Sequence, residues 1–306
     1  MKILITGANG FVGSSMIQHF SAKPNIQIIA NSRKEINKFN NFTNIEYLIS
    51  PLEKLTMDIN CDICIHCAGL ASDKATQKEL WLNNVFASKI LLSKIPNCKK
   101  MIFISSSSIY DFTDDNIKSE GDVGTLNQLS EYGKSKLLAE QEIINSQIES
   151  IYIFRPRAIY GSNDSTLLPR ILKLIKFNCI FVPGSLDVLS SLTSIFNLME
   201  ATEQAILNTK KGCFIYNISD NETYRLENVF EQIVYASLKK KIKFVHLPIQ
   251  IISTIVKISN LFQIKLNITN QSLNYLTKNS ILNNKKSLEE LNLTMADNLH
   301  QYCSTL

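Results

Sequence analysis

The sequence predicts an α/β fold built on a doubly wound parallel sheet, followed by a smaller, mostly helical C-terminal region. Short apolar runs alternate with helical patterns through the first half of the chain, and the first run ends in three glycines, Gly7, Gly10 and Gly13. Strands that alternate with helices form parallel sheets covered on both faces. With 306 residues, 45% of them apolar and 19% charged, the composition is that of a globular protein with a sizeable core.

The glycines mark the turn after the first predicted strand. Residues 1–6 are mostly apolar, and a helical pattern runs from Phe11 to about Ala22. Gly7 would allow a sharp turn, Gly10 a close approach of a pyrophosphate, and Gly13 close packing of the helix on the strand. The phosphates would bind at the helix N-terminus. An ordinary loop is the alternative, because the spacing is Gly-x-x-Gly-x-x-Gly, but the flanking strand and helix favour a dinucleotide-binding turn.

The remaining elements of the first half follow in order. We expect strands over residues 26–30, 45–48, 62–66, 101–104 and 151–154, and helices over about 76–95 and 130–148. Residues 111–129 are acidic and contain glycine, which is typical of a loop. Apolar residues recur at helical spacing over residues 248–262, and this stretch is too short and too polar to span a bilayer.

The end of the second predicted strand bears on the choice of dinucleotide. An acidic residue there would bind the ribose hydroxyls of NAD, whereas an arginine accommodates the 2′-phosphate of NADP. The sequence reads Asn31-Ser32-Arg33-Lys34, and the first carboxylate is Glu35. This pattern favours NADP(H), with NAD(H) possible. The alternative is that Arg33 and Lys34 are surface charges at a strand end.

The seven cysteines predict reduced thiols and a cytoplasmic protein, since their number is odd and no secretory signal is recognisable. Cys61, Cys64 and Cys67 have the spacing of a metal site. Residues 62–66 resemble a strand, however, in which Cys61 and Cys67 would point to one face and Cys64 to the other. We therefore expect no metal, because such thiolates cannot converge on one ion.

The formal net charge of +5 is distributed along the chain. The lysine runs at 99–100, 210–211 and 239–241 are short and lack interleaved aromatic residues. We interpret them as solvated faces, and expect a small-molecule substrate, no nucleic-acid partner and no membrane insertion.

Candidate catalytic residues lie in the helix predicted over 130–148. Tyr132 and Lys136 are four residues apart and share a helix face, so the ammonium can lower the pKa of the phenol. A second such pair, Tyr235 and Lys239, shows that the spacing alone arises by chance. Only Tyr132 follows a strand that ends in serines 105–108. Because ligands bind at the carboxyl ends of parallel strands, Gly7, Ser106 and Tyr132 are expected at one sheet edge.

In their order and spacing, these motifs resemble the extended short-chain dehydrogenase/reductase superfamily, specifically its NAD(P)-dependent epimerase/dehydratase group. The resemblance covers essentially the whole chain. Its matching stretches are residues 6–13, 66–69, 84–85, 103–110, 132–136 and 155–161.

The resemblance implies roles for individual residues. Tyr132 would be the general acid/base, Lys136 would lower its pKa and bind the nicotinamide ribose, and Ser106 would hydrogen-bond the substrate oxygen, with Ser105 or Ser107 as alternatives. Arg157 would lie on the nicotinamide side. The residues implied to contact the cofactor are Gly7, Asn9, Gly10, Phe11, Val12, Gly13, Ser32, Arg33, Cys67, Ala68, Gly69, Asn84, Tyr132, Lys136 and Pro156.

The chain departs from the family pattern at three places. Asp111 replaces a glycine after the Ser-rich segment, and Ser50 stands where an acidic residue commonly contacts adenine. Leu189-Ser190 occupies the place of a diphosphate-binding arginine in sugar-nucleotide 4-epimerases and 4-ketoreductases. Arg170, Lys173 or Arg225 could substitute for it.

Three hypotheses for function follow from the resemblance. The first is an NAD(P)-dependent oxidoreductase or epimerase acting on a nucleotide sugar, by 4-keto reduction or 4-epimerisation. The second is a 3β-hydroxysteroid-dehydrogenase-like reductase or dehydrogenase of a non-nucleotide hydroxy or keto compound, favoured by the missing arginine and by Leu247-Pro248. The third is a non-catalytic NAD(P)-binding regulator, although such relatives usually lack the tyrosine and lysine that this chain keeps.

The resemblance also implies an organisation. Residues 1–158 would form the Rossmann NAD(P)-binding domain, rejoined by a return segment at about 187–218, and residues 159–306 would form the substrate-binding region. A homodimer through the helices at about 76–95 and 130–148 is possible.

Overall fold

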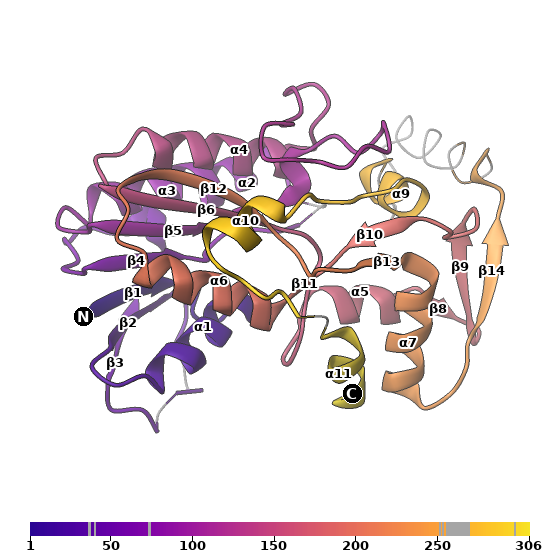
Figure 1. The fold of residues 1–306 in the computed structure, drawn as a ribbon, viewed down its shortest axis with the longest axis horizontal. Coiled ribbons are helices and arrows are strands. Elements are labelled where there is room, and N and C mark those ends of the chain that lie inside the picture. Colours follow the sequence, from indigo (N-terminus) through magenta and orange to yellow (C-terminus); the bar gives the residue numbers. More distant parts are fainter. Residues whose placement is uncertain are drawn as a thin grey trace.

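A seven-stranded parallel sheet forms the larger part of the molecule (Figure 1). The computed structural model describes residues 1–35, 38–39, 41–72, 75–250, 252, 254, 270–296 and 298–306. The strands run in the spatial order β12-β6-β5-β4-β1-β2-β3. They are β1 (Lys2–Thr6), β2 (Gln27–Ser32), β3 (Ile45–Ile49), β4 (Ile63–His66), β5 (Lys100–Ile104), β6 (Ser150–Pro156) and β12 (Gly212–Ile218).

The strand order reverses between β1 and β4. From β1 the chain moves outward through β2 to β3, then crosses back to β4 and continues to β5 and β6. The pairing aligns Thr6 with both Asn31 and His66, so the carboxyl ends of three strands lie level. A reversal of this kind opens a crevice at the carboxyl edge, where ligands bind in open α/β sheets. The predicted doubly wound parallel sheet is confirmed.

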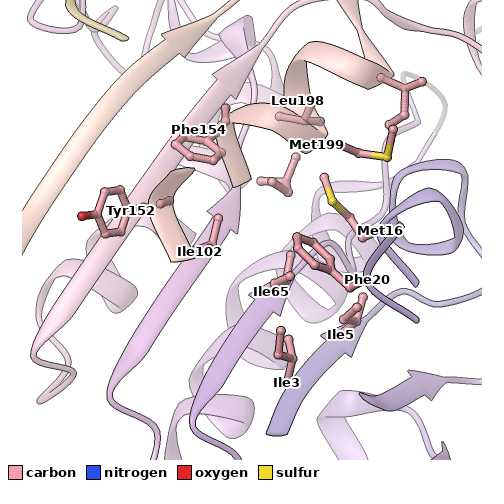
Figure 2. Close-up of a cluster of buried hydrophobic side chains, with 14 of the residues drawn as sticks. Ile3, Ile5, Met16, Phe20, Ile65, Ile102, Tyr152, Phe154, Leu198 and Met199 are labelled. Carbon is pink, nitrogen blue, oxygen red and sulfur yellow. The ribbon is translucent and has the colours of Figure 1, made fainter. Parts of the chain in front are cut away.

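Alternating side chains divide the core between the two faces of the sheet. Ile3, Ile5 and Phe154 pack against α1 (Phe11–Ser21) and α6 (Ile195–Leu207), and Figure 2 shows this cluster closing over Met16 and Leu198. Leu4, Met101, Phe103 and Ile153 face the opposite side, against α3 (Ala87–Ser93) and α4 (Glu131–Ile144). Adjacent residues of a strand therefore point into opposite cores, as the two-residue period of a strand requires.

The helix predicted over 76–95 is present but interrupted. It begins as α2 (Gln77–Leu80) under a capping box made by Thr76 and Glu79, passes through a π-helical turn, η2 (Trp81–Phe86), and continues as α3. The sequence pattern did not predict the π turn, which often marks functional sites. Short 3₁₀ turns also occur at η1 (Leu52–Lys54) and η3 (Ser107–Ile109).

A smaller, second core lies at the C-terminal side, on the right in Figure 1. It joins a three-stranded sheet, ordered β14-β9-β8, to helices, and Ile180, Val182 and Ile233 are fully buried in it. The elements of this part are β7 (Ile159–Tyr160), α5 (Leu167–Lys173), β8 (Ile175–Lys176), β9 (Cys179–Pro183), β10 (Leu189–Ser191), β11 (Thr193–Ser194), β13 (Thr223–Arg225), α7 (Leu226–Leu238), β14 (Lys243–Leu247), α9 (Asn270–Thr277) and α11 (Leu299–Ser304). Helix α10 (Lys285–Glu290) packs instead against β12 of the large sheet.

The helix predicted over 248–262 lies mostly outside the described residues. Within the part of the chain that is described, no helix has both the length and the apolar composition needed to cross a bilayer.

The predicted orientation of the cysteines was wrong in one respect. Cys61 and Cys64 share the core on the α3/α4 side, whereas Cys67 packs with the core on the α1/α6 side. The strict alternation applies only within β4, which begins at Ile63, so Cys61 precedes the strand and does not follow its period.

Candidate active site

The glycine turn between β1 and α1 has the geometry of an anion cradle. Gly7 has a positive φ of 70°, and a Cβ on Gly13 would lie 2.2 Å from the Gly7 carbonyl oxygen, so α1 packs on the turn at a distance that only glycine permits. Gly10 is the N-cap of α1, and no side chain caps this helix. The N–H groups of its first turn are thus left to a ligand, and the residues fit a dinucleotide pyrophosphate.

The end of β2 is organised by Asn9. Its amide nitrogen donates to the Ser32 hydroxyl at 3.0 Å and to the carbonyls of Lys34 and Glu35 at 3.1 and 3.2 Å. Arg33 is exposed next to this turn, and its guanidinium donates to the Asn83 side chain at 3.4 Å. Asn9, Ser32 and Arg33 therefore lie together beside the glycine turn, and a cation stands where β2 ends.

A buried histidine links the ends of β1 and β4. Ser88 donates its only hydroxyl proton to the Asn84 carbonyl, at 2.6 Å, so His66 Nε2, 2.9 Å away, must be the donor to Ser88. His66 Nδ1 then accepts from Thr6, at 2.7 Å. Burial, with a smaller contribution from Lys136, lowers the pKa of His66 to about 3. This histidine is neutral in the folded protein and holds the crevice strands in register.

Asn84 fastens the π turn to helix α4. Its amide nitrogen donates to the Ser135 hydroxyl at 2.8 Å and to the Leu70 carbonyl at 3.1 Å, and its oxygen accepts from the Leu70 N–H at 2.6 Å. A Cβ on Gly69 would meet this Asn84 oxygen at 3.2 Å. Asn84 and Gly69, both predicted to contact the cofactor, are therefore neighbours. The hydrogen bonds of the Asn84 side chain to Leu70 position the loop after β4.

The serines after β5 are not equivalent. Ser105 is buried and donates to Glu140 at 2.5 Å, and Ser107 is also buried. Ser106 is half-buried, and its hydroxyl oxygen accepts from the Ser108 N–H at 3.1 Å. Of the three candidates that the sequence left open, Ser106 has the position best suited to reach a substrate oxygen.

The start of α4 lies directly on this serine turn. Ser130 caps the helix by accepting from the Gly133 N–H at 3.0 Å, and a Cβ on Gly133 would lie only 2.2 Å from the Ser108 carbonyl oxygen. The contact places the backbone of Tyr132, the preceding residue of α4, next to this turn. Sequence analysis missed Gly133, although its place between the tyrosine and the lysine is visible in the sequence.

Lys136 lies one helical turn after Tyr132 and is buried. Its ammonium donates to the Ile104 carbonyl at 2.8 Å and stands 4.0 Å from the centre of the Phe103 ring. Burial lowers its pKa to about 8, and the nearby Glu140 opposes this shift in part. By contrast Tyr235 is largely exposed, and Lys239 ends α7 in a left-handed conformation, so this second pair has no comparable surroundings.

A buried ion pair fastens α4 to strand β6. Arg155, at the end of β6, donates to both oxygens of Glu140, at 3.1 and 2.6 Å. The same guanidinium donates to the Tyr110 hydroxyl at 3.0 Å and to the Glu120 carbonyl at 2.7 Å. Sequence analysis did not assign Arg155 or Glu140 a role. The sequence did contain a clue to this pair, because each charged residue stands among apolar residues of a predicted strand or helix.

Pro156 ends β6 in a buried position, and Arg157 follows it. The Arg157 guanidinium lies between two aromatic rings, 4.8 Å from the centre of Phe112 and 4.7 Å from that of Tyr275, and its Nε donates to Ser190 at 3.2 Å. Burial lowers its pKa to about 10. Arg157 therefore joins β10 and α9 at this edge.

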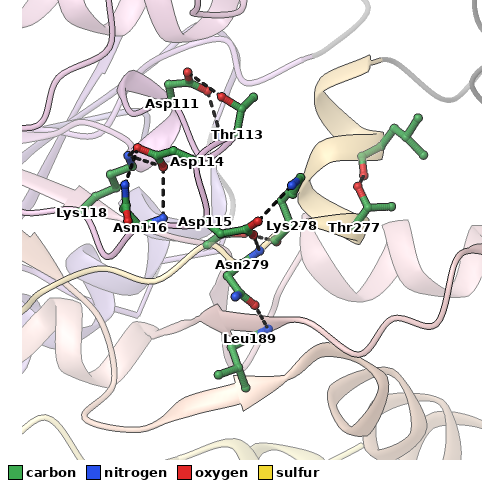
Figure 3. Close-up of polar contacts among 12 residues, drawn as sticks. Asp111, Thr113, Asp114, Asp115, Asn116, Lys118, Leu189, Thr277, Lys278 and Asn279 are labelled. Atoms are coloured by element: carbon green, nitrogen blue, oxygen red, sulfur yellow. Dashed lines mark hydrogen bonds and ion pairs between the residues drawn. The ribbon is translucent and has the colours of Figure 1, made fainter.

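Asp111, one of the departures from the family pattern, has a local function. Its carboxylate accepts from the Thr113 N–H at 3.0 Å and hydroxyl at 2.8 Å, which closes a turn (Figure 3). Next to it, Asp115 pairs with Lys278 at 3.0 Å and accepts from the Asn279 N–H at 2.6 Å. Figure 3 shows that Asp115 fastens this acidic loop to the segment after α9.

A pocket of about 570 Å³ lies where β9 and β14 end. Its polar lining includes the ion pair of Asp187 with Arg225 and the pair of Glu227 with His246, the latter 3.7 Å apart. β10 and β13 pair antiparallel with Leu189 directly opposite Arg225. Opposed residues in such a pair share one face. Arg225 thus projects beside the position where the family arginine is missing.

Comparison with known proteins identifies the family. The profile described as "NAD dependent epimerase/dehydratase family" matches residues 3–219. The chain belongs to this family. It is accordingly an enzyme of the extended short-chain dehydrogenase type, as the motifs predicted, and a nicotinamide dinucleotide is its cofactor.

Individual relatives are distant. The chain is 24% identical over 262 residues to UDP-glucose 4-epimerase of Vibrio cholerae, covering 77% of this chain and 75% of that enzyme. It is also 24% identical over 250 residues to 2-alkyl-3-oxoalkanoate reductase of Shewanella oneidensis, covering 75% of this chain and 64% of that enzyme. The fold is that of UDP-glucuronic acid 4-epimerase of Bacillus cereus, solved with NAD, with a TM-score of 0.78, 19% identity and coverage of 99% and 96%.

Proposed function

We propose that this protein is an epimerase or 4-ketoreductase of a nucleotide sugar. The observation that carries the proposal is the contact of Gly133 with the Ser108 carbonyl, which holds Tyr132 at the serine turn while Lys136 is buried one turn away. This arrangement lies at the same sheet edge as the glycine turn. A bound nicotinamide would accept and return a hydride there.

The residues supply the proton chemistry. A phenol is a weak base unless a cation lowers its pKa, and Lys136 is the cation on the same helix face. Tyr132 would remove the proton from a substrate hydroxyl when the hydride leaves, and return it when a carbonyl is reduced. Ser106 would donate to the same oxygen and stabilise the charge that develops on it. His66 and Asn84 position the loops around these groups.

Arg225 is our candidate for the missing diphosphate-binding cation. Arg170 and Lys173 are exposed on α5, and neither lines the pocket at the ends of β9 and β14, whereas Arg225 does. A substrate diphosphate would replace Asp187 as the partner of its guanidinium. Arg225→Gln is expected to raise KM for a UDP-sugar about 10- to 100-fold with little change in kcat. Arg170→Gln is the matched control, and equal effects of the two substitutions would refute this assignment.

The catalytic assignment is tested by a pair of matched substitutions. Tyr132→Phe is expected to reduce turnover by about 10²- to 10⁴-fold, because the proton donor is lost, and to leave cofactor affinity nearly intact. Tyr235→Phe should change neither quantity. Single-turnover hydride transfer and fluorescence titration with the cofactor provide the two measurements. Full activity in the Tyr132 variant would show that the site is elsewhere.

A reductase of a non-nucleotide ketone is the second candidate. Leu189 in place of the arginine, together with Leu247-Pro248, favours it. A thermal-shift screen separates the two candidates, since a ligand that binds only the native state raises the melting temperature. Stabilisation by UDP, GDP or dTDP supports the nucleotide sugar. Stabilisation by alkyl or steroid ketones in the presence of cofactor, with no effect of the nucleotides, supports the second candidate.

For the cofactor, we propose a preference for NADP(H) over NAD(H). Support comes from exposed Arg33 and Lys34 and from the lack of a carboxylate on Asn31 and Ser32 at the end of β2. Titration of protein fluorescence with NADPH and NADH tests this preference, and equal or tighter binding of NADH contradicts it. Arg33→Gln should weaken NADPH binding and leave NADH binding unchanged.

We also propose a homodimer through the helical layer that contains α3 and α4. Trp81 and Leu82 in the adjoining π turn are exposed apolar residues, 48% and 37% exposed. Such residues are enriched at interfaces. Light scattering at micromolar concentration should give twice the mass of 34.6 kDa. A monomer mass would refute the dimer.

A further inference from the structure

The turn between β8 and β9 carries an aromatic side chain in an unfavourable position. Its two residues, Phe177 and Asn178, both have positive φ, 50° and 57°, as in a type I′ hairpin turn. Asparagine or glycine suits both positions, whereas a bulky residue at positive φ is strained. Phe177 is nevertheless 94% exposed, so burial against the described residues does not offset the strain.

Lysines surround this turn. The strand register places Lys176 and Lys243 on either side of Cys179, in one row on one face of the small sheet. The Lys240 ammonium donates to the Asn178 side chain at 2.9 Å, which ties the loop after α7 to the hairpin. Two residues beyond Cys179, on the same face, Phe181 is 43% exposed. We call this surface the hairpin patch; it comprises Lys176, Phe177, Phe181, Lys239, Lys240, Lys241 and Lys243.

The positive charge of the hairpin patch is not neutralised within the described part of the chain. All five of its lysines are exposed, and none forms an ion pair with a described residue. Nine other lysines, including Lys118, Lys211 and Lys278, do form such pairs. The patch lies where β14 begins beside β9, at the end of the molecule opposite β1 to β3 (Figure 1).

We propose that the hairpin patch binds the surface of membranes that contain anionic phospholipids. Unpaired lysines are attracted to the negative surface potential of such a membrane. A phenylalanine that protrudes from a rigid turn can insert at the level of the acyl chains while the lysines remain at the headgroups. Nucleic acids are instead bound by aromatic residues that lie along a basic groove. The protruding Phe177 favours the lipid surface.

This proposal revises the interpretation of the run Lys239-Lys240-Lys241 as a solvated face. No aromatic residue is interleaved in the run, but the fold brings Asn178, 62 residues away, to Lys240 and with it Phe177. The proposal concerns attachment at a surface and is independent of the substrate.

Sedimentation with sucrose-loaded vesicles tests the proposal on the full-length protein. Wild-type protein is expected to bind vesicles of 70% phosphatidylcholine and 30% phosphatidylserine and to be released from them at high salt. It should not bind vesicles of pure phosphatidylcholine. Phe177→Asn should weaken binding about tenfold or more, through the lost apolar contact. The double variant Lys241→Gln/Lys243→Gln should weaken it about 25-fold, or roughly fivefold per lysine. Because asparagine suits positive φ, Phe177→Asn should keep or raise the melting temperature.

Matched controls lie elsewhere on the surface. Phe196→Ser removes a half-exposed phenylalanine of α6, and Lys210→Gln/Lys211→Gln removes two lysines of another run; both should bind vesicles like the wild type. Equal binding to both vesicle types, or unchanged binding of Phe177→Asn, overturns the proposal. So does tight binding of a 20-nucleotide single strand without binding to vesicles, or a change of Phe177→Asn from dimer to monomer.

Discussion

His66 shows how a single buried residue makes stability depend on pH. Its two nitrogens join Thr6 and Ser88, and burial lowers its pKa to about 3 from an ordinary value of 6.5. The unfolded chain therefore binds a proton below pH 6.5 that the folded protein does not bind. The contribution of His66 to stability is complete above pH 6.5 and declines as the pH falls towards 3.

Replacement of His66 by a residue that does not titrate tests whether stability falls with acid for this reason. The wild type should lose about 1.4 kcal/mol of stability per pH unit between pH 6 and 4 through this residue. His66→Asn is expected to be less stable at pH 7, because the hydrogen bonds change, but its free energy of unfolding should fall less steeply with acid. Urea unfolding at pH 7, 6, 5 and 4 gives both slopes, and parallel slopes would contradict a neutral, buried His66.

Helix α4 packs on the serine turn at a distance that only glycine at position 133 permits. The Cβ of Gly133→Ala would be 2.2 Å from the Ser108 carbonyl oxygen, which is backbone and cannot rotate away. The helix would have to move off the serine turn. We expect a loss of about 1–3 kcal/mol in stability and a fall in kcat that exceeds the change in cofactor affinity, because Tyr132 moves with the helix.

Gly121→Ala is the control for this prediction. A Cβ at Gly121 meets no atom within 4 Å, so thermal unfolding and turnover should match the wild type. If both glycine variants behave alike, contact with the serine turn does not position Tyr132.

At the scale of the whole molecule, the pair of Arg155 and Glu140 connects parts that are distant in sequence. The two side chains are 3% and 1% exposed, and Tyr110 extends the connection to Asn217 of β12 with a hydrogen bond of 2.7 Å. Helix α4, strands β6 and β12 and the loop that contains Glu120 are thereby joined through one guanidinium.

Arg155→Met would leave the Glu140 carboxylate buried, with the Ser105 hydroxyl as its remaining side-chain donor among the described residues. The expected loss is about 3–5 kcal/mol in the free energy of unfolding, measured with urea. The exposed pair of Lys285 and Glu289 offers a control, since Lys285→Met should change stability by about 1 kcal/mol or less. A loss of similar size in both variants would mean that burial of the pair is unimportant.

The local pattern of the sequence determined the fold class, the family and the order of the elements. Residues three or four apart on a helix, and alternate residues on a strand, report which faces are buried, so β1 to β6, α1 and α4 could be located from their own residues. The glycine turn and the pair of Tyr132 and Lys136 were recognised for the same reason, because each motif lies within one short segment.

Tertiary structure decided what depends on residues far apart. The bond of Ser105 to Glu140, the close approach of Gly133, the pairing of Arg155 with Glu140 and the place of Arg225 opposite Leu189 all depend on which strands and loops meet. The same holds for Phe177 beside Lys240. Hydrogen bonds, close packing and exposure are properties of neighbours in space, and only the folded chain determines those neighbours.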